Sequence, residues 1–326
     1  MLSLQNQIFN IKTEQEFNAL ALEIFNFQFL HNSTYNEFCK HLKINPLSVK
    51  KIQDIPFLPV EFFKTHAIKT GDFNAQKIFL SSGTTGMTQS EHLVKDLSLY
   101  EASYKNAFKQ FYGSIKDYCV LGLLPSYLER EGSSLIYMVN DLIKESKHSD
   151  SGFFLDNHQD LVDILAKNII KNQKTILFGV SFALLDLAES YQIDLSDVII
   201  METGGMKGRR KELTRKELHG IYKESFKVSE IHSEYGMTEL LSQAYSKGNG
   251  VFKTPNWMKI LIRDVNDPFN FLENNKTGGI NVIDLANINS CSFIATQDLG
   301  RCAAEEFEVL GRFDNSDLRG CNLLIS

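Results

Sequence analysis

Short apolar, β-branched runs alternate with helical patterns through the middle of the sequence. The β-rich runs occupy residues 119–124, 175–179 and 197–201, and apolar side chains recur at helical spacing in residues 159–171 and 182–191. Strands that alternate with helices along a chain line up parallel in one sheet, because each helix returns the chain to the edge where the last strand began. The sequence therefore predicts an α/β fold built on a largely parallel sheet.

The regions on either side of this alternation follow different patterns. Residues 14–42 carry apolar side chains at helical spacing with a break at 31–33, which predicts a pair of helices. After Lys247 the helical spacing fades, and three strand-like runs joined by polar turns follow, at 259–262, 279–283 and 292–296. We expect an N-terminal helical segment (1–54), an α/β core (55–250) and a smaller β-rich subdomain with a C-terminal tail (251–326).

Charge and cysteine usage exclude several classes of protein. The formal net charge of −6 gives no electrostatic footprint for nucleic acid. No apolar stretch approaches the ~18 residues of a membrane span, and the first residues lack the pattern of a secretory leader. The five cysteines are scattered without a CxxC pair, which argues against a disulfide framework or a zinc site. We expect a cytoplasmic protein with reduced thiols, no nucleic-acid partner and no membrane span.

A glycine- and hydroxyl-rich segment follows a strand predicted at residues 76–80. It consists of Ser81, Ser82, Gly83, Thr84, Thr85 and Gly86. Glycines let a backbone curl its N–H groups around a phosphate, and the hydroxyls add further donors. The segment lacks the GK[ST] ending of a Walker A loop, and an ordinary glycine-serine loop is the alternative interpretation.

Three later segments add groups that suit a nucleotide. Tyr235, Gly236, Thr238 and Glu239 place a ring, a hydroxyl and a carboxylate on one turn, which suits adenine, phosphate and Mg²⁺ respectively. Asp298 and Arg312 offer a carboxylate for ribose hydroxyls and a guanidinium for ribose or phosphate.

In this order and spacing, the segments resemble those of the adenylate-forming superfamily of acyl-CoA synthetases, luciferases and peptide-synthetase adenylation domains, from about Ile55 onward. The resemblance implies the large N-terminal domain of these enzymes and the use of ATP and Mg²⁺ to convert a carboxylic acid to its acyl-adenylate. It assigns a role to each residue: Thr84 and Thr85 over the phosphates, Tyr235 on adenine, Gly204 and Gly205 along the adenine pocket, Thr238 at the α-phosphate, Glu239 on Mg²⁺, and Asp298 and Arg312 at the ribose.

Two features depart from the superfamily pattern. Thr88 and Gln89 stand where the phosphate loop usually continues to a proline and a lysine, and Lys95 is a candidate substitute for that cation. Residues 311–320 resemble the hinge into a C-terminal domain of about a hundred residues, yet the sequence ends at Ser326. We therefore expect the mobile C-terminal domain and its catalytic lysine to be absent.

Three further stretches, at 55–64, 124–135 and 318–322, resemble the LuxE-type acyl-protein synthetases, which load a fatty acid onto a cysteine of their own. This resemblance places Cys321 at the acylated position and implies transfer onward to a partner such as an acyl reductase. Two alternatives stay open. One is a free acyl- or aryl-CoA ligase of the phenylacetate type, and the other is a non-catalytic relative that binds a nucleotide or an acyl group.

Overall fold

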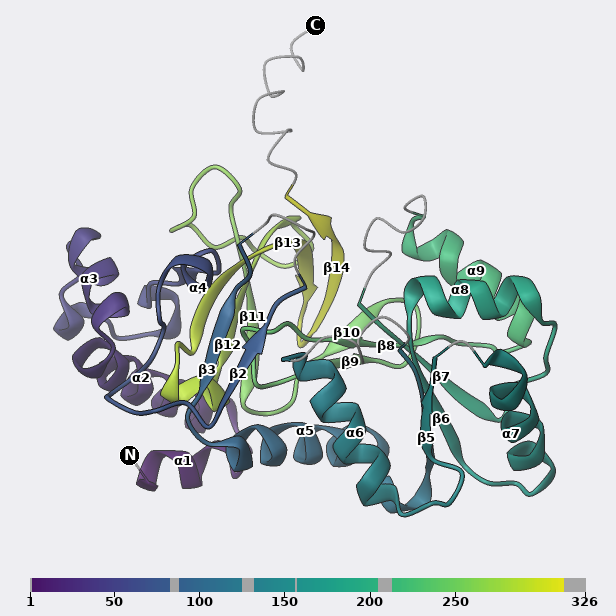
Figure 1. Cartoon of the computed structure of the whole chain (residues 1–326). Coiled ribbons are helices and arrows are strands. Elements are labelled where there is room, and N and C mark those ends of the chain that lie inside the picture. The colour runs from purple at the N-terminus through teal and green to yellow at the C-terminus, as the bar shows by residue number, and fades with distance from the viewer. Residues whose placement is uncertain (1, 83–87, 125–131, 156, 205–212, 314–326) are drawn as a thin grey trace, which may run out of the picture. The chain divides into compact units, whose positions relative to one another are not determined.

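The computed structural model describes residues 2–82, 88–124, 132–155, 157–204 and 213–313 (Figure 1). The chain forms two compact units. The first unit combines residues 1–72 with residues 256–326, and the second consists of residues 73–255.

The second unit contains the predicted parallel sheet. Its strand order is β10-β9-β8-β7-β6-β4-β5, in which β5, β4, β6, β7 and β8 are parallel neighbours and β9 and β10 extend the sheet antiparallel. The strands span Cys119–Leu123 (β4), Gly152–Phe154 (β5), Thr175–Val180 (β6), Val198–Thr203 (β7), His232–Tyr235 (β8), Ala244–Ser246 (β9) and Val251–Lys253 (β10). Every residue of β4 and β6 is buried, as expected for strands covered on both faces.

Helices cover both faces of this sheet, with α5 and α6 on one side and α7, α8 and α9 on the other (Figure 1). They span Leu97–Tyr112 (α5), Ser134–Ser146 (α6), His158–Ile170 (α7), Ser181–Ser190 (α8) and Arg215–Phe226 (α9). Side-chain caps explain several starts: Asp96 accepts a hydrogen bond from Ser98 N, and Thr214 and Glu217 form a capping box. A separate antiparallel hairpin joins Lys77–Leu80 (β2) to Glu91–Val94 (β3).

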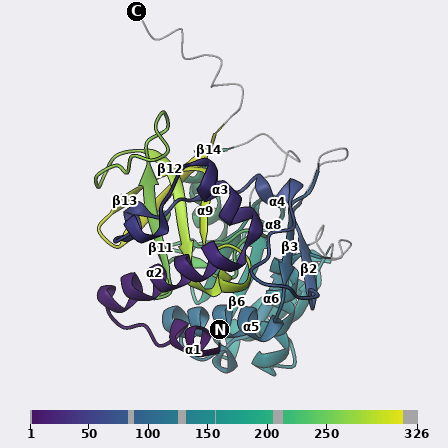
Figure 2. The same cartoon turned by 90° about the vertical axis from the view of Figure 1, so that its left-hand side faces the viewer.

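The first unit packs N-terminal helices beside strands from the far end of the sequence. Figure 2 shows α2 (Glu14–His31) alongside β11 (Met258–Arg263) and β13 (Phe293–Ala303). Gln28 of α2 anchors this packing, because its Nε2 donates to the Asn287 carbonyl at 3.0 Å and its Oε1 accepts from Ser292 N at 2.9 Å. The remaining elements are α1 (Leu2–Ile8), α3 (Ser33–His41), η1 (Pro46–Ser48), η2 (Ile52–Asp54), β1 (Leu58–Pro59), α4 (Phe62–Thr65), β12 (Gly278–Asp284), η4 (Leu285–Asn289) and β14 (Glu306–Arg312).

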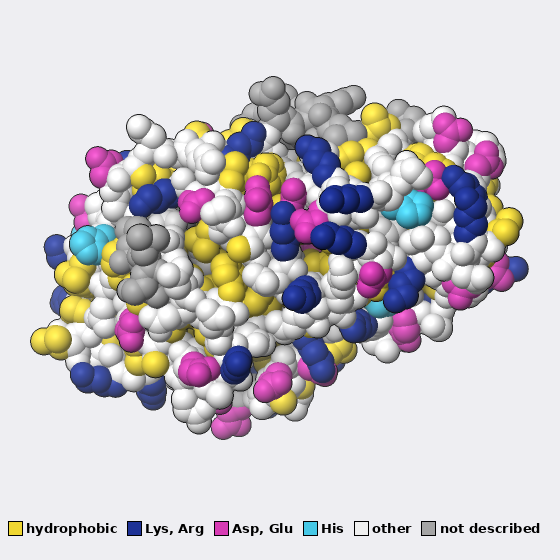
Figure 3. Space-filling model, turned by 90° about the horizontal axis from the view of Figure 1, so that it is seen from below, with side chains coloured by type: hydrophobic (Ala, Val, Ile, Leu, Met, Phe, Trp, Pro, Cys, Tyr) yellow, Lys and Arg dark blue, Asp and Glu magenta, His cyan; other side chains and the backbone are white. Residues whose placement is uncertain are grey.

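The predicted break between the first two long helices falls at Asn32. This residue ends α2 and caps α3, since its side chain accepts a hydrogen bond from Tyr35 N. Among the described residues, no helix has the length and apolar character needed to cross a membrane. On the face seen in Figure 3, basic and acidic side chains are interspersed.

Candidate active site

The turn that follows β8 brings together four of the predicted residues. Tyr235 is the last residue of β8, and Gly236, Thr238 and Glu239 follow it directly. This turn lies at the carboxyl end of a parallel strand, the edge at which open α/β sheets bind their ligands. Tyr235 is partly exposed and meets the Phe252 ring edge-on at 6.0 Å, whereas Glu239 is 5% exposed.

A histidine connects this turn to the hairpin that carries the hydroxyl-rich segment. His92 on β3 is buried, and burial lowers its pKa to about 4, so the ring is neutral near pH 7. Its Nδ1 lies 2.8 Å from the Thr238 carbonyl and donates to it. No motif in the sequence marks His92 as part of the site.

Two hydrogen bonds join Ser81, which follows β2, to Ser90, which precedes β3, and we call this pair the neck of the hairpin. Ser81 N donates to the Ser90 carbonyl at 3.0 Å, and the Ser81 hydroxyl accepts from Ser90 N at 2.8 Å. Ser82 is exposed beside this neck. Gly83, Thr84, Thr85 and Gly86 lie outside the described residues, and His92 ties the described part of their hairpin to the Thr238 turn.

We expect the buried His92 to make the protein less stable in acid. The unfolded chain binds a proton at this ring near pH 6.5, whereas the folded chain does so only near pH 4. Between these values the unfolded state holds more protons, so stability falls as the pH falls, by about 1.4 kcal/mol for each pH unit. Between pH 7 and pH 5, the free energy of unfolding measured with urea should fall by about 2 kcal/mol less in His92→Asn than in the wild type.

The exposed His66 supplies a control for this measurement. His66→Asn should keep the acid sensitivity of the wild type. Equal sensitivity in the wild type and His92→Asn would contradict a neutral buried ring at position 92.

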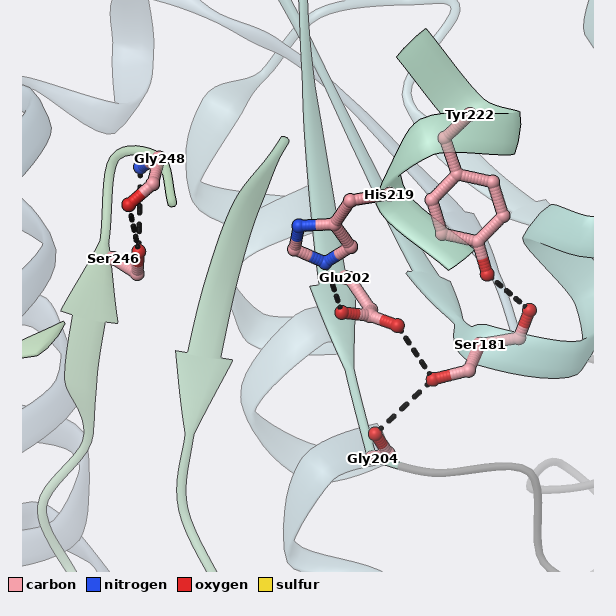
Figure 4. A network of polar contacts seen from close by, with 7 residues as sticks. All are labelled: Ser181, Glu202, Gly204, His219, Tyr222, Ser246 and Gly248. Atoms are coloured by element: carbon pink, nitrogen blue, oxygen red, sulfur yellow. Dashed lines mark hydrogen bonds and ion pairs between the residues drawn. The ribbon is translucent and has the colours of Figure 1, made fainter. Parts of the chain in front are cut away.

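The end of β7 is held by a buried polar network (Figure 4). The Glu202 carboxylate lies 2.7 Å from His219 Nε2 and accepts from the Ser181 hydroxyl at 2.8 Å. The same hydroxyl lies 3.2 Å from the Gly204 carbonyl, and Tyr222 donates to the Ser181 carbonyl at 2.6 Å. The network fixes Gly204 against the start of α8.

Gly204 itself has a φ of +69°, which lies in the left-handed region that favours glycine. Glycine is therefore the favoured residue where the chain leaves β7. The next predicted residue, Gly205, lies outside the described residues.

Asp298 and Arg312 meet in the first unit, where β13 and β14 place them opposite each other. Arg312 Nε donates to Asp298 Oδ1 at 3.0 Å. Asp298 is 7% exposed, whereas the Arg312 side chain is 72% exposed. The two residues predicted to bind the ribose therefore form an ion pair with each other.

The one buried carboxylate of the Thr238 turn suits a magnesium ion that arrives with a nucleotide. Mg²⁺ is usually held by one or two carboxylates together with substrate phosphates and water, rather than by a cage of protein ligands. No group of three or more His, Cys, Asp or Glu side chains is placed to hold a metal in the described part of the chain. Glu239 therefore offers what Mg²⁺ usually takes from a protein, which is a single carboxylate.

Burial raises the pKa of all four described cysteine thiols. The pKa rises to about 12 for Cys39 and about 11 for Cys302, and it is also raised for Cys119 and Cys291. Thiols with such pKa values are protonated near pH 7 and are poor nucleophiles. Cys321 lies outside the described residues.

The Tyr235 ring provides a separate test of nucleotide binding. Tyr235→Ala should weaken ATP binding by about 1 kcal/mol or somewhat more, because an aromatic face is lost. Tyr235→Phe keeps the ring and should bind ATP as the wild type does. Titration calorimetry with ATP measures both variants, and equal affinities in all three proteins would place adenine elsewhere.

Comparison with solved structures identifies the fold. ATP-bound MatB from Rhodopseudomonas palustris aligns with a TM-score of 0.56 and 16% identity over 72% of this chain and 47% of MatB. A 2-hydroxyisobutyryl-CoA ligase in complex with 2-HIB-AMP and CoA aligns with a TM-score of 0.67 and 12% identity over 95% of this chain and 71% of the ligase. The chain thus spans about half the length of MatB. Its fold is that of the large N-terminal domain of adenylate-forming enzymes, as predicted.

Comparison of sequences then gives the family. No curated protein matches the chain significantly. The profile of the family described as acyl-protein synthetase, LuxE, matches residues 5–326. The chain belongs to this family, as the sequence motifs predicted.

Proposed function

We propose that this protein uses ATP to activate a carboxylic acid as its acyl-adenylate and then transfers the acyl group to its own Cys321. One observation carries the first half of the proposal. A ring, a hydroxyl residue and a buried carboxylate share the turn after β8, and His92 joins this turn to the hairpin of the hydroxyl-rich segment. These are the groups that adenine, a phosphate and its magnesium ion require.

Each residue has a defined task in this proposal. Tyr235 supplies a face for adenine, Thr238 contacts the α-phosphate, and the 81–86 segment surrounds the phosphates. Gly204 and Gly205 line the adenine pocket, and Asp298 and Arg312 bind the ribose. Glu239 holds Mg²⁺, which supplies positive charge against the phosphate oxygens.

The proposed reaction has two steps, formation of the acyl-adenylate and formation of the thioester. A carboxylate oxygen of the acid attacks the α-phosphorus of ATP, a new P–O bond forms, and the bond to the β-phosphate breaks to release pyrophosphate. The Cys321 thiolate then attacks the acyl carbon, a C–S bond forms, and the C–O bond to the phosphate breaks to release AMP. Adenylation is what makes the second step possible, because AMP is a far better leaving group than hydroxide.

Two considerations support Cys321 as the acyl acceptor. The four described cysteines carry raised thiol pKa values, which disfavour them as nucleophiles. Arg312 and Arg319 lie near Cys321 in the sequence and supply positive charge that favours a thiolate. The nine residues that separate Cys321 from Arg312 span at most about 30 Å when fully extended, which limits how far the thiol can lie from Arg312.

Family membership supports three finer assignments. We propose a fatty acid as the substrate, a cytoplasmic location, and onward transfer to an acceptor protein such as an acyl reductase. The sequence motifs for this branch at 55–64, 124–135 and 318–322 support these assignments.

ATP–pyrophosphate exchange against a panel of carboxylic acids tests the proposal. We expect exchange that depends on the acid, followed by a mass increase of one acyl group on the protein. Exchange that yields a product only when coenzyme A is added would instead indicate a free CoA ligase. No exchange with any acid, together with retained ATP binding, would indicate a non-catalytic relative.

A further inference from the structure

Three polar side chains lie on one face of β8 and of the β9 region, and we call them the polar cluster: Glu234 on β8, Tyr245 on β9 and Gln243 directly before β9. The register opposes Glu234 to Tyr245 and Tyr235 to Ala244. Because side chains alternate along a strand, Glu234 and Tyr245 share one face with Gly236 and Gln243, and Tyr235 points to the opposite face. The cluster thus lies on the side of β8 away from the proposed adenine ring.

Two atoms of the cluster are buried without a hydrogen-bond partner. Tyr245 is 1% exposed and Gln243 is 4% exposed. Within the described residues, neither the Tyr245 hydroxyl nor Gln243 Oε1 meets a donor or acceptor. Buried polar groups are almost always hydrogen-bonded, so two unsatisfied atoms on one face indicate a missing partner.

Glu234 places a carboxyl group at the same position. Thr203 donates to its Oε2 at 2.5 Å, and its Oε1 points toward Gly236. Burial raises the pKa of this carboxyl to about 7, and the nearby Tyr100 and Tyr245 hydroxyls interact with it electrostatically. A carboxyl whose pKa is raised in this way is partly protonated near pH 7, and it suits an uncharged hydrogen-bonding partner better than a cation.

Gly236 is exposed and borders the polar cluster. A Cβ atom at position 236 would overlap Glu234 Oε1 and lie 3.3 Å from Gln243 Cγ. Residue 236 must therefore be glycine for the Glu234 carboxyl to lie against this turn. Gly236 is two residues from Thr238, so the cluster lies close to the turn assigned to the α-phosphate.

We propose that the polar cluster binds a hydroxyl group carried by the substrate acid within a few carbons of its carboxyl group. A hydroxyl accepts a hydrogen bond from the Tyr245 hydroxyl and donates one to Gln243 Oε1, which satisfies both buried atoms at once. The inference rests on the proposed function and narrows its substrate from an acid to a hydroxy acid. When adenine lies on the Tyr235 face, the acyl portion is the part of the acyl-adenylate that is left to reach the polar cluster.

Paired acids of equal chain length, one with a hydroxyl at carbon 2 or 3 and one without, test this proposal in the pyrophosphate exchange assay. We expect the wild type to favour the hydroxy acid by about tenfold or more in kcat/KM, because a site built around a hydroxyl rejects the analogue that lacks it. Tyr245→Phe removes only the unsatisfied hydroxyl and should reduce this ratio to within about threefold of unity.

Tyr118→Phe is the matched control, since Tyr118 is also buried in the second unit and donates its hydroxyl to the Tyr112 carbonyl at 3.1 Å. It should keep the wild-type preference. Equal use of both acids by the wild type would overturn the hydroxy-acid inference while leaving acid activation standing. An unchanged preference in Tyr245→Phe would also overturn it and would assign the cluster to a buried water. Absence of exchange with every acid would instead refute the proposed function.

Discussion

Glu239→Gln is expected to lower acid-dependent ATP–pyrophosphate exchange by at least about a hundredfold. A metal ion at a transferring phosphoryl group contributes several kcal/mol to the transition state, and a neutral amide is a much weaker ligand than a carboxylate. Each 1.4 kcal/mol corresponds to a factor of ten in rate. The side chain is buried and nearly isosteric after the change, so the fold should survive.

The matched control for this variant is Glu101→Gln. Glu101 lies on α5, is partly buried, and accepts a hydrogen bond from the Tyr137 hydroxyl at 2.6 Å. It should retain exchange within a few-fold of the wild type. Raising the magnesium concentration should partly restore Glu239→Gln, and wild-type exchange in this variant would rule out the metal role.

Cys321→Ser is expected to separate the two half-reactions. Exchange should continue because the adenylation groups are untouched, whereas the acyl group should no longer be retained on the protein as a thioester. A serine hydroxyl is far less acidic than a thiol and is not activated by the same surroundings. Labelled acid, ATP and treatment with hydroxylamine measure the thioester directly.

Cys302→Ser tests whether this loss is specific, because Cys302 is the described cysteine that is not fully buried. Burial raises the pKa of its thiol to about 11, so this variant should acylate like the wild type. Covalent acylation at the wild-type level in Cys321→Ser would place the acceptor elsewhere. Loss of both half-reactions in Cys321→Ser would instead give the tail a structural role.

Local patterns in the sequence predicted much of the fold. The expected strand at 175–179 corresponds to β6, and the expected helix at 182–191 corresponds to α8. Periodicity and capping are local properties, so a single sequence carries them directly. The parallel orientation of these strands follows from the same alternation.

Contacts between segments that are distant in the sequence could not be predicted from local patterns. The hydrogen bond from His92 to the Thr238 carbonyl spans 146 positions, and the bond from Gln28 to Asn287 spans 259. Neither leaves a periodic signal, because the contact depends on how hairpins and strands meet in space. For the same reason the sequence patterns did not indicate that residues 1–72 and 256–326 form one unit.

The two-part first unit also has a consequence for synthesis on the ribosome. The buried face of α2 packs against segments around residues 287–293, while α2 itself ends at His31. Translation proceeds at about 5–20 residues per second, so some 10–50 seconds pass between the emergence of this helix and that of its partners. The second unit, whose residues are contiguous, is complete before the first unit can close. During that interval the apolar side chains of α2, such as Ile24 and Phe25, have no native partner on the strands that later bury them.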